Sequence, residues 1–516
     1  MGGQPMFILS EDSQRTQGKD AQSSNISAGK AVSEAVRTTL GPRGMDKMLV
    51  SDDGDVVITN DGATILGEMD IEHPAANMLV EVAETQEEEV GDGTTTASIL
   101  AGELLAKAED LLDDDVHPTT IVEGYYEAAS LAQDAIEDLV VEGDLEDEDL
   151  IEVAESSMTG KGTGDVAARP LAETVVNAVR HVRDGRVERE NITVHTQVGS
   201  SSSATELIEG VIVDEEPVHE NMPRTVEDAA IAVIDGDIDL KESNIDAEYN
   251  VNNVDQLNAA IEAEETELRG YADHLADIGV EVAFVSGDVE DRVSAYLAKS
   301  GILAIEDVGD LEALAGATGA SRVGSVSDLE ADELGNAETI TVRNYGDESL
   351  TIIEGGSAAE AVTIFARGGT EHVVDELERA INDALDVVTA ALDRGGVVPG
   401  AGASEVAIAD YVRTHAARVE GRKQLAVEAF ADAVDVVPRT LATNTGMDPI
   451  DALVDLRAAY EDGTLSGVIS EGQTGVIDDP LEYGVIDPAA VKREAVDSAT
   501  EAATMIVRID DVIAAS

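Results

Sequence analysis

Residues 91–96 read Gly91-Asp92-Gly93-Thr94-Thr95-Thr96 and stand directly before a segment with a regular apolar pattern. In residues 97–112 the apolar side chains recur at i, i+3, i+4 and i+7, which predicts a helix with one apolar face. Two glycines permit backbone geometries closed to other residues, and three threonines offer hydroxyls. The start of a helix presents unpaired N–H groups with partial positive charge. The motif therefore predicts a phosphate-binding loop.

Asp92 indicates how this loop would hold a phosphate. A carboxylate repels a bare phosphate, whereas Mg²⁺ favours one or two carboxylates together with phosphate oxygens and water. Asp92 is therefore a candidate magnesium ligand. Taken alone, the motif is equally compatible with a simple helix N-cap after a glycine turn, so the assignment depends on other parts of the chain.

The charge of the chain excludes several classes of partner. Of 516 residues, 108 are Asp or Glu and 32 are Lys or Arg, which gives a formal charge of -76. Such a surface repels nucleic acid and anionic lipid, so neither nucleic acid nor a membrane is expected as a partner. A hydrophobic content of 43% still allows the chain to build cores. Because the acidic residues are spread along the whole sequence, we expect adaptation to a salt-rich cytoplasm, where repulsion is screened. An acidic surface that captures basic partners is the alternative.

Length and residue usage give further bounds. About three domains are expected from the length. The chain has no cysteine, which excludes disulfides and thiolate metal sites. Its start lacks a basic and then apolar leader, and no run of about 18 apolar residues occurs, so a cytoplasmic protein is expected.

The predicted secondary structure changes twice along the chain. The first 140 residues are mostly helical in pattern, with a hairpin-like segment whose β-run at 56–59 ends in a strong turn signal, Asn60-Asp61-Gly62. From about Val211, short β-rich runs alternate with helices, and the helical pattern returns at Glu371. This order predicts a multidomain α+β protein in which a mixed segment is inserted into a helical domain that contains both chain ends.

Two more glycine turns flank helical segments. One is Leu40-Gly41-Pro42-Arg43-Gly44, and the other is Val397-Val398-Pro399-Gly400-Ala401-Gly402-Ala403. Each taken alone is compatible with an ordinary helix end or start. The second is no dinucleotide fingerprint, because the full G-x-G-x-x-G pattern is missing.

Five motifs in a fixed order make these segments informative together. The motifs are Gly41-Pro42-Arg43-Gly44-Met45-Asp46-Lys47-Met48, Asn60-Asp61-Gly62-Ala63-Thr64, Gly91-Asp92-Gly93-Thr94-Thr95-Thr96, Arg367-Gly368-Gly369-Thr370-Glu371 and Ser498-Ala499-Thr500-Glu501-Ala502. With these motifs, the chain resembles the group II chaperonins, the family of the archaeal thermosome, from about Gln4 to Ile513.

The resemblance implies a chaperonin fold of three domains. It implies a mostly helical equatorial ATP-binding domain at 1–143 and 397–516 and a small intermediate hinge domain at 144–211 and 361–396. An α/β apical domain at 212–360 would bind clients and carry a helical protrusion near 253–277. The polar character of that helix means that the lid assignment depends on its position alone.

The resemblance also implies an ATP site with bound Mg²⁺. Asp61 and Asp383 would flank the attacking water, and Asp92 would bind the metal. Lys161 would sense the γ-phosphate, with a solvated loop cation as the alternative. The residues implied to contact the phosphates are Leu40, Gly41, Pro42, Gly93, Thr94, Thr95 and Thr96, and those implied to face the ribose and base are Gly402 and Asp487.

The implied function is an ATP-hydrolysing chaperonin subunit that encloses non-native proteins in a double ring. The ring would contain copies of this chain, paralogous subunits or both, with eight subunits per ring. Two departures from the family pattern leave an alternative open. Ala401 replaces a glycine, and the apical segments 285–291 and 305–310 are acidic rather than basic. The alternative is a specialised ring subunit with a mainly structural or client-specific role. A stand-alone small-molecule enzyme such as a kinase is the third class.

Overall fold

The structure is a computed structural model, and it describes residues 14–51, 54, 56–141, 145–161, 168–240, 254–345, 348–356 and 361–514. These residues group into two compact units. Unit 1 comprises Met1–Val176 and Asp375–Ser516, and unit 2 comprises Asn177–Val374. The three-domain division stays a prediction, because both segments of the expected hinge domain contribute residues to each unit. Residues 162–167 of the glycine-rich loop and 250–253 before the protrusion helix lie outside the described residues.

Unit 1 is mainly helical. Its helices are α1 (Lys19–Val36), α2 (Gly62–Gly67), α3 (Pro74–Val90), α4 (Thr94–Asp113), α5 (Pro118–Leu139), α6 (Asp147–Met158), α12 (Ala403–Ala416), α13 (Lys423–Val434), α14 (Val436–Asn444), α15 (Pro449–Glu461) and α16 (Ala489–Val507), together with parts of α7 (Ala168–Val182) and α11 (Glu371–Asp393). Antiparallel strand pairs complete it: β1 (Gln14–Gln17) with β20 (Asp511–Ala514), β2 (Lys47–Val50) with β3 (Val56–Thr59), β16 (Val397–Pro399) with β19 (Ile486–Pro488), and β17 (Gly467–Glu471) with β18 (Thr474–Asp478).

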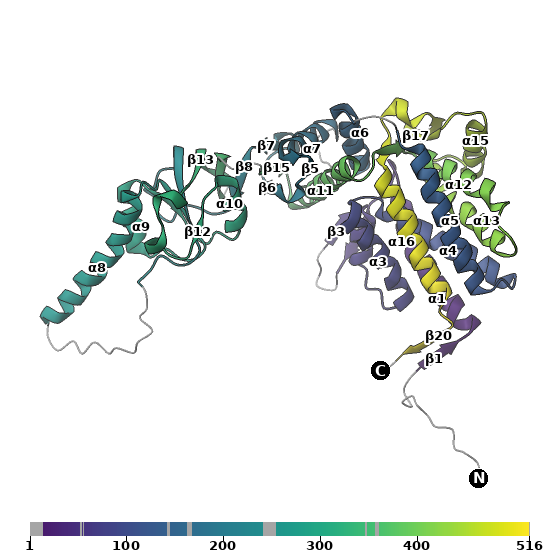
Figure 1. Ribbon diagram of the computed structural model, residues 1–516, viewed down its shortest axis with the longest axis horizontal. Helices are drawn as coiled ribbons and strands as arrows, with labels where there is room; N and C mark the ends of the chain where they lie inside the picture. Colours follow the sequence, from purple (N-terminus) through teal and green to yellow (C-terminus); the bar gives the residue numbers. More distant parts are fainter. Residues whose placement is uncertain are drawn as a thin grey trace, which may run out of the picture. The chain divides into compact units, whose positions relative to one another are not determined.

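Helix α4 lies at the centre of the core of unit 1. It packs against α1, α13 and α16, and Figure 1 shows α16 running alongside it. The expected apolar face, with Leu104 and Leu105, is buried, but so are Ser98 and Ile99 on other faces. Each fully buried aliphatic side chain contributes about 1.5–3 kcal/mol. The N-terminus of α4, where the glycine and threonine loop begins, is therefore fixed by a large core.

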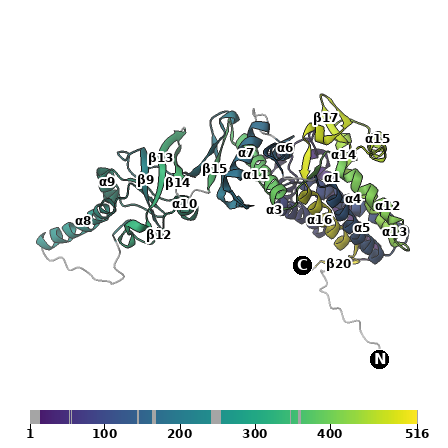
Figure 2. The same cartoon turned by 45° about the horizontal axis from the view of Figure 1, so that its top comes forward.

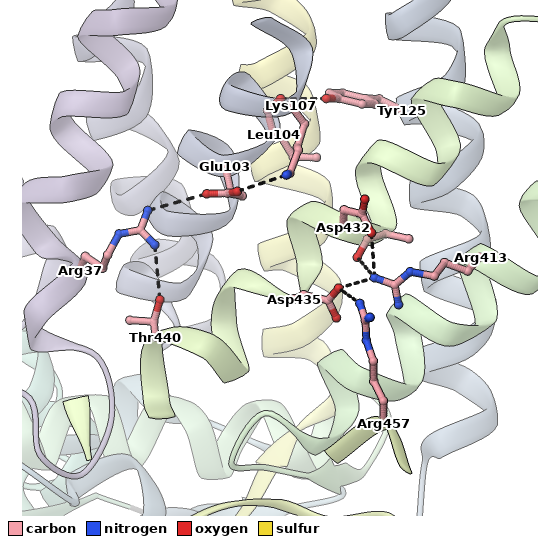
Figure 3. A network of polar contacts seen from close by, with 11 residues as sticks. Arg37, Glu103, Leu104, Lys107, Tyr125, Arg413, Asp432, Asp435, Thr440 and Arg457 are labelled. Atoms are coloured by element: carbon pink, nitrogen blue, oxygen red, sulfur yellow. Dashed lines mark hydrogen bonds and ion pairs between the residues drawn. The ribbon is translucent and has the colours of Figure 1, made fainter. Parts of the chain in front are cut away.

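Two groups of polar contacts fasten the helices around this core (Figure 3). Asp435, between α13 and α14, is buried and accepts hydrogen bonds from Arg413 of α12 and Arg457 of α15. Burial raises the pKa of Asp435, and the two guanidinium groups oppose that shift. At the end of α1, Arg37 donates to Thr440 Oγ1 at 3.4 Å. These contacts link the C-terminal helices to the segment that leads into the Leu40 turn.

Unit 2 contains a seven-stranded mixed sheet and a three-stranded sheet. The larger has the order β11-β10-β9-β13-β14-β8, with β12 also paired to β9, and the smaller has the order β6-β15-β7. The elements are β4 (Arg183–Asp184), β5 (Arg186–Val187), β6 (Ile192–Val198), β7 (Glu206–Ile208), β8 (Gly210–Val213), β9 (Thr225–Ile234), α8 (Val254–Asp277), β10 (Val282–Val285), α9 (Asp291–Ser300), β11 (Leu303–Ile305), α10 (Leu311–Thr318), β12 (Arg322–Val323), β13 (Gly335–Tyr345), β14 (Glu348–Gly356) and β15 (Val362–Gly368).

Helix α8 is the long polar helix that the sequence predicts. Its C-terminal part joins the core of unit 2 through Leu268, Ala272 and Leu275, which are buried. Residues 261–267 are exposed, and Figure 2 shows the helix extending beyond the sheet. An exposed polar half explains why the sequence pattern has no continuous apolar stripe. Among the described residues, no helix has the length and apolar character needed to cross a membrane.

Candidate functional site

The glycine and threonine loop joins α3 to α4 in unit 1. Gly91 and Gly93 have left-handed φ values of 70° and 83°. A Cβ atom at Gly91 would lie 2.3 Å from Asp386 Cβ, and one at Gly93 would lie 2.8 Å from Val491 Cγ1. Both positions therefore require glycine for conformation and for space. Gly93 is the N-cap residue of α4, and no described side chain caps that helix, so its first N–H groups are available to an anion.

Asp92 is held in place by hydrogen bonds to its side chain and to its backbone. Its Oδ1 accepts a hydrogen bond from Gly93 N at 2.7 Å, and its backbone carbonyl accepts one from Gln86 Nε2 at 2.7 Å. Burial raises the pKa of Asp92, while the charge of Lys161 opposes the shift. The second carboxylate oxygen is left for a ligand. A carboxylate with one oxygen fixed and one available beside unpaired helix N–H groups fits Mg²⁺ bound to a phosphate.

Asp61 follows the predicted β-run at 56–59, which is strand β3 in the structure. Strand β3 pairs with β2 before it, and Asn60-Asp61-Gly62 starts α2. Asp61 Oδ2 accepts from Thr64 N at 2.7 Å, so the side chain caps this helix. Its Oδ1 accepts from Thr94 Oγ1 at 3.2 Å. The turn signal therefore coincides with a helix N-cap, which uses the same residue types, and the cap brings Asp61 to the glycine and threonine loop.

Lys161 and Asp383 form a buried ion pair between residues far apart in the sequence. Their side chains are 13% and 9% exposed, and Lys161 Nζ donates to Asp383 Oδ2. Burial raises the pKa of Asp383 to about 7, against the opposing charge of Lys161 and with a contribution from Asp61. Burial would lower the pKa of Lys161, but Asp383 and Asp92 outweigh it and raise the value. Asp383 is thus engaged by Lys161.

The Leu40 turn lies against the loop that carries Lys161. Gly41 has a φ of 85°, and Asn444 Nδ2 donates to the carbonyl of Leu40 at 2.9 Å. A Cβ atom at Gly160 would lie 3.2 Å from Gly41 O, so these two segments are in close contact. Asn60 Nδ2 donates to the carbonyl of Gly160 at 2.5 Å. The turn, the end of β3 and the Lys161 loop therefore meet.

Arg43, the next residue of the Leu40 turn, contacts a different loop. Its guanidinium donates to the carbonyl oxygens of Gly472 at 2.6 Å and of Gln473, in the turn between β17 and β18. The planar fork of arginine suits two neighbouring carbonyls. Arg43 does not belong to the described residues that line the cavity.

A cavity of about 460 Å³ in unit 1 gathers the predicted residues. Asp383 does not belong to its described lining, and it contacts the lining residue Lys161 instead. The predicted site residues that line the cavity are Leu40, Gly41, Pro42, Asp61, Asp92, Gly93, Thr94, Thr95, Thr96, Lys161, Gly402 and Asp487.

Four residues of this region are absent from the sequence predictions: Gln86, Glu87, Glu405 and Lys492. Gln86 is buried and donates to the carbonyls of Asp92 and Val491, the latter at 3.2 Å. Lys492 lines the cavity and pairs with Glu405 and Asp487. Gln86 and Lys492 each occupy an apolar-stripe position of a helix, and a polar residue at such a position is the signal that could have found them.

Ala401 has a left-handed φ of 55° between Gly400 and Gly402. This conformation costs a residue with a Cβ atom about 1–2 kcal/mol. We therefore expect Ala401→Gly to stabilise the protein by about 1 kcal/mol, measured by urea unfolding in concentrated KCl. Ala403→Gly is the matched control, because Ala403 is the first residue of α12 and a helical glycine is less stable by about 1 kcal/mol. A less stable Ala401→Gly variant would contradict the strain.

Glu87 provides a test of the electrostatics of the site. Burial, with Asp383 and Asp61 adding to it, raises the pKa of Glu87 to about 9, and its Oε2 has no hydrogen-bond partner among the described residues. A raised pKa means that stability is lost as the pH rises from 4.5 towards 9. Glu87→Gln should therefore be more stable than the wild type, by an increment that grows by up to about 1.4 kcal/mol per pH unit in this range.

The increment is measured by urea unfolding at pH 6 and pH 8 at constant KCl. The exposed neighbour Glu88 provides the control, since Glu88→Gln should give the same stability change at both values. An increment for Glu87→Gln that is independent of pH would refute the raised pKa.

Comparison with known proteins identifies the family. The model of the TCP-1/cpn60 chaperonin family matches residues 32–516, and the chain belongs to this family. It is 66% identical to thermosome subunit 3 of Haloferax volcanii, over 99% of this chain and 99% of the relative. It is 54% identical to thermosome subunit 1 of the same organism, and 52% identical to the thermosome subunit alpha of Halobacterium salinarum. These two matches cover 99% and 100% of this chain and 92% of each relative.

Proposed function

We propose that this chain is the subunit of a cytoplasmic double-ring chaperonin that encloses non-native proteins and uses ATP hydrolysis to close the ring. Membership of the chaperonin family supports it. The observation that carries the ATP assignment is the cavity of about 460 Å³, where the anion-binding start of α4, Asp92, Asp61 and Lys161 converge. A volume of several hundred Å³ suits a ligand of nucleotide size.

In the proposed site, the phosphates lie between two glycine turns. Gly93 and Thr94 to Thr96 would bind them through the N–H groups of α4 and through hydroxyls, and Leu40 to Pro42 would contact them from the opposite turn. Asp92 would hold Mg²⁺ with its second oxygen. A bound Mg²⁺ neutralises the charge that develops on the phosphates. Gly402 and Asp487 would face the ribose and base, because β16 and β19 pair Val398 with Asp487 beside the Gly400 loop.

Asp61 and Asp383 would orient the attacking water and accept its proton. Asp383 is occupied by Lys161, so hydrolysis requires this ion pair to open. The γ-phosphate would provide a competing anion for the Lys161 ammonium, and Asp383 could then accept a proton from water. We infer that Lys161 couples the presence of the γ-phosphate to the availability of Asp383, and that a movement of the hinge segments accompanies this exchange.

The ring would consist of this chain, of paralogous subunits or of both, with eight subunits per ring as the resemblance implies. A specialised subunit with reduced ATPase activity is the second candidate, and the strained Ala401 favours it. The presence of Asp61, Asp92 and Asp383 together opposes it, because a purely structural subunit needs none of them.

Two measurements on the purified protein in concentrated KCl test the proposal. We expect steady-state ATP hydrolysis that requires Mg²⁺, and light scattering at about sixteen times the chain mass of 53.9 kDa. Assembly without hydrolysis would favour the specialised subunit. A monomer or dimer would overturn the chaperonin proposal in favour of a stand-alone enzyme.

A further inference from the structure

Lys492 lies at a position that is electrostatically unfavourable for a positively charged side chain. It lies in the first turn of α16, where the helix dipole disfavours a cation, and its side chain is only 10% exposed. An ammonium group buried without a partner is costly. Its presence here therefore requires compensation by nearby anions.

Two carboxylates from other elements supply that compensation. Lys492 Nζ lies 2.7 Å from Asp487 Oδ2 on β19 and 2.7 Å from Glu405 Oε1 on α12. Burial alone would lower the pKa of Lys492, but Asp487 and Glu405 outweigh it and raise the value above the ordinary one. The ammonium thus stays charged, and the three side chains carry a net charge of about -1.

The two carboxylates differ in their access to the cavity. Glu405 is 6% exposed, and its Oε2 has no hydrogen-bond partner among the described residues, so it acts as an inner anchor. Asp487 is 25% exposed and lines the cavity. Its Oδ2 is held by Lys492 and lies 3.1 Å from the place of a Cβ atom at Gly400. The oxygen left to accept hydrogen bonds from a ligand is therefore Oδ1.

We propose that Lys492 is a positioning residue for ribose selection: anchored on Glu405, it holds Asp487 in the one orientation that accepts hydrogen bonds from the ribose hydroxyls of the nucleotide. This inference rests on the proposed ATP site. Without the cation, Asp487 would lose its ion-pair partner and the link through Lys492 to the buried Glu405. Nothing would then hold the carboxylate in that orientation, and the positioned acceptor for the hydroxyls is lost.

The test compares binding of ADP and of 2′,3′-dideoxyADP, which lacks both hydroxyls, by calorimetry of the full chain in concentrated KCl. A hydrogen bond to a charged acceptor makes ADP bind the wild type at least about tenfold more tightly. In Lys492→Met we expect this ratio to fall to about one, through weaker ADP binding, while the affinity for the dideoxy nucleotide changes less than about threefold. Asp487→Asn should show the same pattern.

Two further variants make the result specific. Lys423→Met removes a cation by the same substitution from the partly exposed pair of Lys423 with Glu127, which lies outside the described lining of the cavity, and it should keep the wild-type ratio. If Lys492→Met fails to fold, the double variant Lys492→Met with Glu405→Gln restores the net charge of the cluster, and it should fold with a ratio of about one.

The remaining outcomes test the positioning role of Lys492, ribose selection and the ATP site separately. A tenfold ratio that persists in a folded Lys492 variant overturns the positioning role. Equal binding of both nucleotides by the wild type overturns ribose selection while the ATP site stands. A wild type that binds neither nucleotide overturns the proposed function, and the present inference with it.

Discussion

Replacing Asp383 with asparagine should lower the rate of ATP hydrolysis by at least about 100-fold and change the affinity for ADP by less than about threefold. The carboxylate is the proposed acceptor of the proton from water, and an amide cannot take that role. Nucleotide affinity is retained because Asp383 does not belong to the described lining of the cavity. The rate is measured as phosphate release and the affinity by calorimetry, both in concentrated KCl.

Asp375→Asn is the matched control for this prediction. Asp375 lies on the same helix, α11, and is exposed, so its replacement should leave turnover unchanged. The thermal stability of Asp383→Asn is measured alongside, since the change leaves the Lys161 ammonium without its carboxylate. A folded Asp383→Asn protein that turns over ATP at the normal rate would show that the assigned mechanism is wrong.

Removal of salt should dissociate the assembly and lower the unfolding midpoint by about 10 °C or more. The net charge of -76 is screened over about 3 Å in molar salt but over about 10 Å at 0.1 M, where neighbouring carboxylates repel one another. Light scattering measures the size of the assembly, and circular dichroism measures unfolding. Both are followed while the KCl concentration is varied from about 0.1 to about 3 M.

Sucrose at matched osmolality separates screening from surface exclusion, because a neutral osmolyte is excluded from the protein surface but does not screen charge. Restoration of the assembly by sucrose alone would contradict the electrostatic explanation. Equal stability in dilute buffer and in concentrated KCl would contradict salt adaptation itself. The similarity to subunits from Haloferax volcanii and Halobacterium salinarum agrees with such adaptation.

The parts of the site that the sequence predicts best are those set by local rules. The helix predicted over residues 97–112 from its apolar spacing is observed as α4, which begins three residues earlier, at Thr94. The β-run predicted at 56–59 is observed as β3, but the turn signal after it does not reveal that Asp61 caps α2, because a turn and a helix N-cap use the same residue types. Local patterns alone do not distinguish these two structures.

Local sequence rules do not predict contacts between segments that are far apart in the chain. The pairing of Lys161 with Asp383 depends on how α11 packs, and the resemblance to chaperonins, rather than any spacing, singled out Asp383. Glu87 stands in a run with Glu88 and Glu89 that has the pattern of a solvated acidic surface. Only the packing of α3 shows that one carboxylate of the three is buried among the site residues. In so acidic a chain, the sequence pattern does not distinguish a buried carboxylate near the site from the solvated carboxylates around it.

The pairing of β1 with β20, which joins Gln14 to Ala514, has a consequence for synthesis on the ribosome. Helix α16 supplies Val491, Lys492 and Ala495 to the cavity and packs against α4. The N-terminal helices of unit 1 therefore emerge long before the segment that completes their core. Until α16 has left the ribosome, the growing protein has an incomplete cavity and an uncovered apolar face on α4, and exposed apolar surface of this kind is prone to aggregation.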